Sequence, residues 1–262
     1  MKDDARIHPT AIVHPEARLG SGTVVGPFSI VGEHVRTGEN CEIKEHAIVQ
    51  GHTQLGNAVK IYPNAVVGYD PQHLKYAGEP TRVEIGDRTI LREGVTVHRA
   101  TEFGNKVTRV GKDVFLMAYV HVAHDCVVGD GVVIANAVQL AGHVTLEEKC
   151  TVGGQSAIAQ HCRVGRYAYV GGGSIVRKDM PPFMLAKGTD LRVQGVNQIG
   201  LKRTGLFNDE VIRALKNVYR LFYLRQNTTS RAMEDALAEY GHLDEVRHFV
   251  EFVRQSKLGI ER

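Results

Sequence analysis

The hydrophobic positions of this 262-residue chain recur every six residues along most of its length. A first run of aliphatic residues extends from Ile7 to Val67, with Thr37 as its single lapse, and later runs cover Ile85–Val97 and Val110–Val176. A period of six fits neither the 3.6-residue period of a helical face nor the two-residue period of a simple strand; it is typical of a parallel β-helix built from hexapeptides. The pattern therefore predicts an all-β solenoid in which each hexapeptide supplies one short strand and a corner, and three hexapeptides complete one coil.

The position four residues after each aliphatic residue carries only small or β-branched side chains, as expected if they point into a narrow interior. All four cysteines occupy this position: Cys41, Cys126, Cys150 and Cys162. This placement favours a buried hydrophobic role over a disulfide or a nucleophile. Glycines that directly follow the aliphatic residue, such as Gly20 and Gly86, are expected to supply corner conformations that other residues adopt reluctantly.

The six-residue pattern ends at Met180-Pro181-Pro182, where the sequence changes character. We expect residues 1–182 to form the hexapeptide-repeat β-helix and residues 183–262 to form a linker and a small C-terminal helical domain. Residues 183–205 are glycine-punctuated and predict irregular structure. Asn208 can cap a first helix, and apolar residues at helical spacing predict further helices over 230–240 and 243–257.

Composition excludes some classes of partner. The net charge of +3 is too small to indicate nucleic acid by itself. No apolar stretch approaches the roughly 20 residues that span a bilayer, and the charged segment Met1–Arg6 runs directly into the first repeat, which predicts no signal peptide. Together with unpaired cysteines, these features predict a cytoplasmic protein without a transmembrane segment.

Two interruptions of the repeat, near residues 69–84 and 98–109, are where chemistry is expected, because excursions from a flat prism create clefts. If each interruption is an excursion within one hexapeptide, counting in threes places five repeats on one face; these begin at Val67, Val97, Val122, Leu140 and Ile158. That face then carries both loops together with a cluster of polar residues: His98, His124, Gly142, His143, Gln160 and, at the preceding corner, His121. Such clustering indicates a functional site.

Several stretches on this face and in the tail are distinctive: Gln72-His73-Leu74-Lys75-Tyr76-Ala77-Gly78-Glu79-Pro80-Thr81-Arg82, His121-Val122-Ala123-His124-Asp125-Cys126, Leu140-Ala141-Gly142-His143 and Asn197-Gln198-Ile199-Gly200-Leu201-Lys202-Arg203. They closely resemble the UDP-N-acetylglucosamine acyltransferases of lipid A biosynthesis, and the resemblance covers essentially the whole chain. It implies a left-handed β-helix and a homotrimer with active sites between neighbouring subunits. It also implies transfer of an R-3-hydroxyacyl group from acyl carrier protein to the 3-position of UDP-N-acetylglucosamine.

The chemistry of such a transfer is consistent with the residues. A sugar hydroxyl that attacks a thioester must lose its proton, and an imidazole with a pKa near ~6.5 is suited to remove it at neutral pH. His124 is then the general base, Asp125 fixes its tautomer, and, by the resemblance, the Gly142 N–H binds the oxyanion. A thioester is already activated, so we expect no metal and no cofactor beyond the phosphopantetheine that delivers the acyl group.

The resemblance also implies roles for residues that bind the substrates. Those expected to contact the sugar nucleotide or position the reacting groups are Gln72, Lys75, His98, His121, His143 and Gln160. Asn197 and Arg203 are expected to contact the uridine diphosphate. Gly172 matches the position that limits the acyl chain, and its lack of a side chain leaves room for a long one.

Four positions depart from the family pattern and bear on the acceptor: His73, Ala159, Ile199 and Thr204. They leave open a UDP 3-amino sugar as the acceptor, which would give an amide. The sequence is also compatible with a coenzyme A-dependent sugar-nucleotide N-acyltransferase and with a structural solenoid without activity. A metal-dependent enzyme of the carbonic anhydrase type would use His98, His121 and His124 as ligands.

Overall fold

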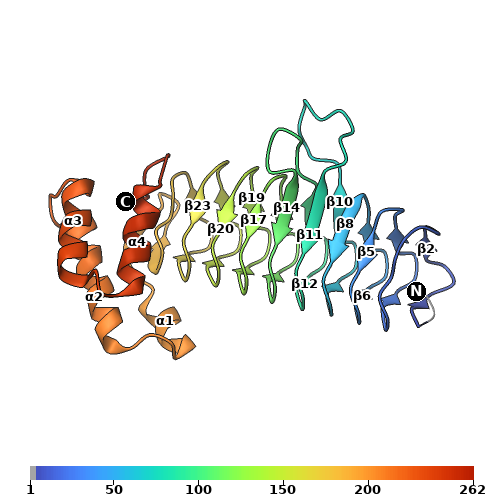
Figure 1. Ribbon diagram of the computed structural model, residues 1–262, viewed down its shortest axis with the longest axis horizontal. Coiled ribbons are helices and arrows are strands. Elements are labelled where there is room, and N and C mark those ends of the chain that lie inside the picture. The colour runs from blue at the N-terminus through green and yellow to red at the C-terminus, as the bar shows by residue number, and fades with distance from the viewer. Residues whose placement is uncertain (1–3) are drawn as a thin grey trace.

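The computed structural model describes residues 4–262 and shows a long three-sided prism of short strands, followed by a group of helices at one end (Figure 1). Residues 1–3, which belong to the predicted first domain and to the charged segment before the first repeat, lie outside the described residues. Neighbouring strands within each face of the prism are parallel and one coil apart, as Val25 is to Ile7 and to Ile43. The predicted parallel β-helix is confirmed.

Three sheets form the faces of the prism. Sheet A has eleven strands: β1 Arg6–Ile7, β3 Val24–Val25, β6 Glu42–Ile43, β9 Lys60–Ile61, β12 Ile90–Leu91, β15 Phe115–Leu116, β18 Val133–Ile134, β21 Thr151–Val152, β24 Tyr169–Val170, β26 Met184–Lys187 and β27 Arg192–Val196. Sheet B has nine: β2 Ile12–Val13, β4 Ile30–Val31, β7 Ile48–Val49, β10 Val66–Tyr69, β13 Thr96–His98, β16 His121–Val122, β19 Gln139–Leu140, β22 Ala157–Ile158 and β25 Ile175–Val176. Sheet C has seven: β5 Arg36–Thr37, β8 His52–Leu55, β11 Arg82–Ile85, β14 Val107–Val110, β17 Val127–Val128, β20 Thr145–Leu146 and β23 Arg163–Val164.

The interior of the prism is filled as the repeat predicts. From Val25 onward the periodic aliphatic residues are buried, and all four cysteines are buried and free. The Cys126 thiol donates to the backbone oxygen of Ala141 on the next coil, at 3.2 Å. Ile7 is 39% exposed because no further coil covers it among the described residues. Thr37, the lapse in the repeat, hydrogen-bonds within the prism to the N–H of Gly20 and the carbonyl of Gly38.

The prediction for the corner glycines is wrong in its mechanism. Glycines that directly follow the aliphatic residue, such as Gly20 and Gly86, do not have positive φ. They are required because a Cβ would collide with the backbone of the adjacent coil. A Cβ on Gly20 would lie 2.2 Å from the Gly38 oxygen, and one on Gly86 would lie 2.6 Å from the Gly111 carbonyl carbon. The left-handed conformation occurs instead three residues after the aliphatic residue, as at Asp125 after Val122 and at His143 after Leu140, both with φ 62°.

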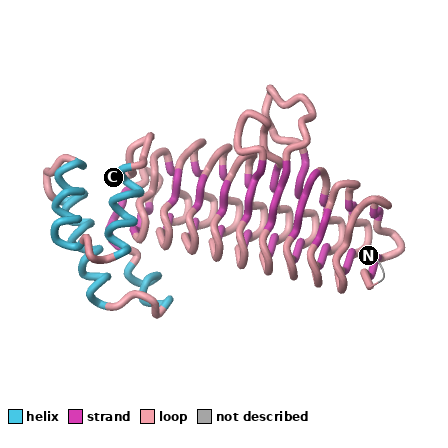
Figure 2. Tube along the Cα trace, in the orientation of Figure 1, coloured by secondary structure: helices cyan, strands magenta, loops and turns pink. Residues whose placement is uncertain are grey.

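The count of hexapeptides across the interruptions is confirmed by the strand register of sheet B. Val67 pairs with Val97, Val97 with Val122, Val122 with Leu140, and Leu140 with Ile158. Both excursions therefore leave the prism along one edge, where Figure 2 shows them projecting side by side. His121 lies within β16 rather than at the corner before it.

The two excursions are shorter than the sequence predicted. Loop 1 comprises residues 70–81, between β10 and β11, and loop 2 comprises residues 99–106, between β13 and β14. The difference arises because β11 and β14 extend the ladder of sheet C with four residues each, so that Arg82 pairs with His52 and with Val107. Both loops connect sheet B to sheet C.

The C-terminal region contains α1 Gln198–Thr204, α2 Asp209–Tyr219, the π-helix η1 Arg220–Leu224, α3 Thr229–Tyr240 and α4 Asp244–Arg254. Asn208 caps α2 as predicted, since its side chain accepts from the N–H of Val211 at 2.9 Å. The prediction that residues 183–205 are irregular is wrong, because β26 and β27 form an antiparallel pair there and α1 follows. No helix within residues 4–262 is long and apolar enough to cross a membrane.

Candidate active site

A cleft of about 400 Å³ opens along sheet B beside the loops. Five of the predicted catalytic and substrate-binding residues line it: Gln72, His98, His121, His124 and Gly142. The rest of the wall is largely apolar and runs along sheet B toward the C-terminal end: Ala123, Gln139, Leu140, Ala141, Ala157, Ile158, Ala159 and Ile175. The cleft therefore joins a histidine cluster to a mostly apolar trough.

His124 and Asp125 form a buried pair at the edge of this cleft. His124 is 7% exposed, Asp125 is fully buried, and Nδ1 of the imidazole lies 2.9 Å from Oδ2 of the carboxylate. An ionised carboxylate can only accept, so in the neutral imidazole Nδ1 carries the proton and Nε2 keeps the lone pair. This is the arrangement that a general base requires.

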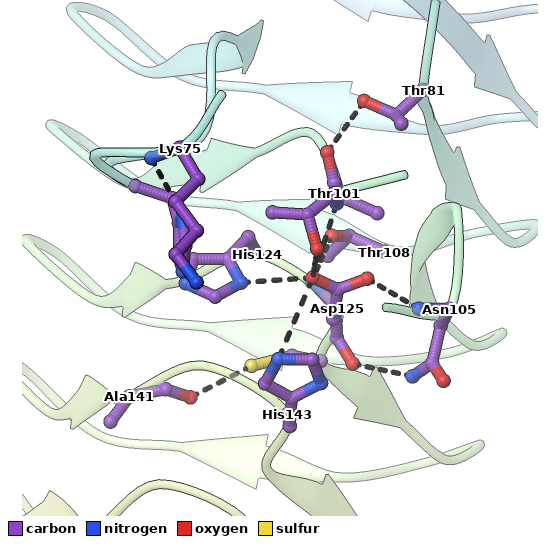
Figure 3. A network of polar contacts seen from close by, with 12 residues as sticks. Lys75, Thr81, Thr101, Asn105, Thr108, His124, Asp125, Ala141 and His143 are labelled. Atoms are coloured by element: carbon purple, nitrogen blue, oxygen red, sulfur yellow. Dashed lines mark hydrogen bonds and ion pairs between the residues drawn. The ribbon is translucent and has the colours of Figure 1, made fainter. Parts of the chain in front are cut away.

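Loop 2 holds the Asp125 carboxylate in place (Figure 3). Oδ2 accepts from the Thr101 N–H at 3.1 Å and from the Thr101 hydroxyl at 2.7 Å, and Oδ1 accepts from the Asn105 N–H at 2.6 Å. The Asn105 side chain also donates to the Asp125 backbone oxygen, and the Asp125 N–H donates to the Thr108 hydroxyl. With His124 included, the buried carboxylate thus accepts from four donors, which compensate the loss of water around its charge.

Two glycines allow the backbone to approach this pair closely. A Cβ on Gly104 would lie 2.3 Å from Oδ1 and 2.6 Å from Oδ2 of Asp125. A Cβ on Gly142 would lie 2.6 Å from Cε1 and 2.8 Å from Nε2 of His124. The absence of a side chain at Gly104 leaves room for the Asp125 carboxylate. Its absence at Gly142 leaves room for the His124 ring on its Nε2 side.

The N–H of Gly142 has no hydrogen-bond acceptor among the described residues. Gly142 stands two residues after the buried Leu140, a corner position that is occupied by proline in earlier coils, as at Pro27 and Pro63. Since proline has no N–H, the ladder does not need a donor at this position. The Gly142 N–H, on the cleft wall, is thus available to an anion.

His98 and His121 are held as neutral imidazoles. Burial lowers the pKa of His98 to about 4, with the neighbouring His121 acting in the same direction, and its Nδ1 has no partner within residues 4–262. Burial, followed by proximity to His124, lowers the pKa of His121, whose Nδ1 shares a 2.7 Å hydrogen bond with the Thr96 hydroxyl. The two rings meet edge to face with centroids 5.1 Å apart. They offer the cleft polar contacts without positive charge.

His73 of loop 1 and His143 of the next coil pack against the His124 ring. The His124 ring is perpendicular to both, with centroid distances of 5.2 Å to His73 and 5.3 Å to His143. His143 also stacks on His161 of the next coil at 4.6 Å, and burial lowers its pKa. The His143 Nε2 lies 3.8 Å from Asp125 Oδ2, too far for a hydrogen bond.

Within the described residues, one group of side chains has the proximity that a metal ion requires: His124, Asp125 and His143. An ion there would have to displace the hydrogen bond between His124 and Asp125 and compete with both Thr101 donors for Oδ2. The set that a carbonic anhydrase would use, which adds His98 and His121 to His124, does not form such a group within residues 4–262.

Comparison with known proteins bears directly on this site. Residues 179–261 match the family model described as UDP N-acetylglucosamine O-acyltransferase, domain 2, and residues 108–142 match the bacterial transferase hexapeptide model. The chain is 46% identical over 256 residues to an acyl-[acyl-carrier-protein]–UDP-N-acetylglucosamine O-acyltransferase of Anaeromyxobacter sp. (strain Fw109-5), covering 98% of this chain and 99% of the relative. A second relative of the same description, from Halorhodospira halophila, is 45% identical over 98% of this chain and 99% of its own length. The chain belongs to this acyltransferase family.

A solved member of the family shares the fold. The structure of LpxA from Acinetobacter baumannii superposes with a TM-score of 0.95 at 36% identity, covering 98% of this chain and 99% of that one. This agreement confirms the left-handed parallel β-helix with C-terminal helices. A carbonic anhydrase and a purely structural solenoid are not favoured.

Some of the residues predicted from the family resemblance lie beside the cleft rather than on its wall. Lys75 is exposed on loop 1, where its backbone N–H donates to His73 Nδ1 at 3.2 Å. Gln160 is exposed directly after Ala159, which lines the cleft. Gly172 is exposed at a corner between sheets A and B, three residues before the cleft residue Ile175.

Asn197 and Arg203 are not brought to the cleft within a single chain. They lie at the two ends of α1, which Figure 1 shows at the C-terminal end of the prism, away from both loops. The Asn197 amide is engaged in the fold, because it caps α1 at the Gly200 N–H and donates to the Tyr167 carbonyl at 3.0 Å. The Arg203 side chain is exposed.

The sequence did not single out the residues that hold Asp125, and it noted His73 only as a departure from the family pattern. Thr101, Gly104, Asn105 and Thr108 surround Asp125, and His73 packs on His124. The signal that could have found them is the count of hexapeptides, which had already placed both excursions on the face of His124. Polar residues in those excursions were therefore candidates by position alone.

Proposed function

We propose that this chain transfers an R-3-hydroxyacyl group from acyl carrier protein to the 3-hydroxyl of UDP-N-acetylglucosamine, the first step of lipid A biosynthesis. Its membership of the family makes it an acyl-[acyl-carrier-protein]-dependent UDP-N-acetylglucosamine O-acyltransferase. The observation that carries the proposal is the buried His124–Asp125 pair, against which Gly142 packs on the Nε2 side of the imidazole; the Gly142 N–H has no acceptor within residues 4–262.

In the proposed step, Nε2 of His124 removes the proton of the sugar hydroxyl as its oxygen attacks the thioester carbonyl carbon. Asp125 stabilises the imidazolium that forms, and the Gly142 N–H donates to the carbonyl oxygen as it becomes an oxyanion. The tetrahedral intermediate collapses by breaking the C–S bond, and His124 returns the proton to the leaving thiolate. Each proton and electron pair is accounted for without a covalent enzyme intermediate.

We propose that the substrates occupy the cleft and its flanks. Gln72, Lys75 and the neutral pair His98 and His121 would position the sugar nucleotide and the reacting groups, with His143 and Gln160 on the following coils. The apolar trough along sheet B, from Ala157 to Ile175, suits an acyl chain. Gly172 would mark the limit of that trough, about three coils or ~14 Å beyond the coil of His124, given strands spaced about 4.8 Å apart.

The working form is proposed to be a homotrimer with its sites between neighbouring subunits. Two observations support this. Sheet B presents outward apolar residues before the cleft, of which Ile12 is 65% exposed, and the predicted nucleotide contacts Asn197 and Arg203 are remote from the cleft of their own chain. A neighbouring subunit could cover the first and bring the second to a cleft.

We also propose a cytoplasmic location and no cofactor other than the phosphopantetheine of the donor. The four free cysteines suit a reducing compartment. A thioester supplies an activated acyl group, so the residues described are sufficient for the transfer.

The proposal is tested by incubating the purified protein with 3-hydroxyacyl-acyl carrier protein donors of several lengths and with UDP-N-acetylglucosamine, followed by mass spectrometry. The expected product is the 3-O-acyl sugar nucleotide. A UDP 3-amino sugar and the matching acyl-coenzyme A are run in parallel, because preferential formation of an amide, or transfer from coenzyme A alone, would contradict the proposed acceptor or donor.

A further inference from the structure

The three residues Arg99-Ala100-Thr101 at the start of loop 2 contact both ends of loop 1 and the catalytic carboxylate. They follow β13 directly, so their position is set by sheet B. Each of the three makes a different connection. Together they link loop 1, which ends at Thr81, to the carboxylate of Asp125, more than 40 residues further along the chain.

Arg99 connects to the first half of loop 1. Its backbone N–H donates to the Tyr69 carbonyl at 2.9 Å, and its guanidinium donates to the Asp70 carboxylate and, at 2.8 Å, to the Tyr76 hydroxyl. The side chain is only 13% exposed, although the Asp70 side chain is 63% exposed. Its aliphatic stem lies over Gly51, where a Cβ would be 2.8 Å from the Arg99 Cδ. Arg99 is thus built into the base of the loop rather than lying on the surface.

Ala100 connects to the far end of loop 1. Its carbonyl accepts from the Thr81 hydroxyl at 2.5 Å, and both residues are buried. Thr101 then turns inward, where its N–H and hydroxyl both donate to Asp125 Oδ2. Figure 3 shows the Thr81 and Thr101 contacts on the same side of the carboxylate.

The segment that Arg99 holds, between Tyr69 and Tyr76, contains Gln72 on the cleft wall and His73 against the His124 ring. We infer that Arg99 is a positioning residue, which fixes loop 1 relative to the catalytic pair so that the sugar nucleotide and the base meet in one geometry. The inference rests on the proposed function, since it assumes that loop 1 binds the acceptor and that His124 is the base.

Arginine suits this position better than lysine. Nη2 of its guanidinium donates to both Asp70 and Tyr76, and the planar group fixes the directions of these donors, whereas an ammonium is a single point charge on a flexible stem. An error of about 1 Å in the placement of a substrate can cost on the order of 10²-fold in rate. Loss of the guanidinium should therefore affect acceptor use more than folding.

The test compares Arg99→Met and Arg99→Lys with Arg109→Met. Arg109 is the control. It lies on β14 of sheet C and pairs with Glu84 of the neighbouring strand β11. Its side chain is 56% exposed, and the carboxylate that it pairs with belongs to neither loop 1 nor Asp125. We expect Arg99→Met to lower kcat/KM for UDP-N-acetylglucosamine at least tenfold, mainly through KM, with partial recovery in Arg99→Lys. Arg109→Met should stay within twofold of wild type. Tyr76→Phe removes one acceptor of Arg99 without altering the core and should give a smaller loss in the same direction.

A binding measurement separates failure of this inference from failure of the proposed function. Calorimetry of UDP-N-acetylglucosamine is performed on His124→Ala and on His124→Ala/Arg99→Met, which both lack the base. The inference predicts weaker binding by the double variant, together with faster tryptic cleavage after the exposed Lys75. Equal affinities and equal cleavage would overturn it, whereas absence of binding by both variants would overturn the proposed acceptor itself.

Discussion

Two pairs of histidines lie on the same edge of the prism, between sheets B and C, and differ almost completely in their surroundings. His34 and His52 stack at 4.3 Å on adjacent coils, but His34 is exposed and its nearest carboxylate, Glu33, is 4.0 Å away and 52% exposed. His124 and His143 are also on adjacent coils, and there Asp125 lies fully buried 2.9 Å from the His124 imidazole. The same corner and the same residue type thus give a pair without a buried carboxylate in one place and the proposed catalytic arrangement in the other.

The difference is made by the two loops. Residues 99–106 supply the donors that allow a carboxylate to be buried. Residues 70–81 bring Gln72 to the cleft wall and His73 against the His124 ring. At a regular corner the histidine side chain is open to solvent. Where a loop covers the corner, the loop excludes water and fixes the carboxylate that pairs with the histidine. The following predictions test this contrast.

The largest effect is expected at His124. His124→Ala should fold and assemble as the wild type does, yet lose activity on the order of 10²- to 10⁴-fold, the usual contribution of a general base. His34→Ala, at the other pair, is the matched control and should leave turnover unchanged. Near-normal turnover of a folded His124→Ala protein would remove this residue from the mechanism.

Gly104→Ala tests whether the loop, and not the pair alone, makes the site. The new Cβ would lie within 2.6 Å of both Asp125 carboxylate oxygens, so the carboxylate or the loop must move. A displacement of this size should reduce kcat by roughly 10- to 100-fold. The unfolding midpoint is measured alongside the rate. A drop in the midpoint large enough to unfold the protein in the assay would show that the loss is global and not local to the site.

The neutral histidines of the cleft should make stability depend on pH. The pKa of His98 is lowered to about 4 by burial, so the unfolded chain binds a proton below its ordinary pKa of ~6.5 that folded His98 refuses. The stabilisation is present above pH ~6.5 and is lost as the pH falls toward 4. Between pH 7 and 5 the loss amounts to about 2 kcal/mol. Chemical unfolding at fixed protomer concentration should therefore show a shallower pH dependence for His98→Asn, and an unchanged slope would refute the account of this residue.

The smallest effect is expected on the preference for acyl donors of different chain length. Gly172 does not have positive φ, unlike Gly173, and the tightest contact of a Cβ on Gly172 would be the Gly154 carbonyl oxygen, at 3.1 Å. Gly172→Met should therefore fold and obstruct the end of the proposed acyl trough. Each excluded methylene forfeits roughly 0.8 kcal/mol, or about fourfold in the specificity constant. When specificity constants are measured for donors of decreasing length, the preference should move to shorter chains. A uniform decrease for all donors would count against a role for Gly172 in limiting the acyl chain.

Much of the fold follows from one periodic feature of the sequence. The period of six specified the parallel coils, and counting it across two interruptions placed His98, His124 and His143 on one face, because sheet register depends only on which residues point inward. The family resemblance then supplied roles for particular residues. Neither step depended on the structure of the loops.

The parts that could not be predicted are those without a period. The contacts of Arg99 with Asp70 and Tyr76, and of Thr101 with Asp125, join irregular segments far apart in the chain. The role of the corner glycines was misassigned for a related reason. Close approach between coils is a property of the assembled prism, whereas φ preference is local and visible in the sequence. Asn197 likewise has a capping role that its family motif alone did not indicate.

The central claim is that a carboxylate buried by loop 2 makes His124 a base. Asp125→Asn tests it most directly, because the substitution preserves size while removing the charge and the fixed tautomer of His124. The initial rate of transfer from 3-hydroxyacyl-acyl carrier protein to UDP-N-acetylglucosamine is measured at saturating substrates. The account predicts a fall in kcat on the order of 10²-fold or more with the KM for the sugar nucleotide little changed. A kcat within threefold of the wild-type value would contradict it.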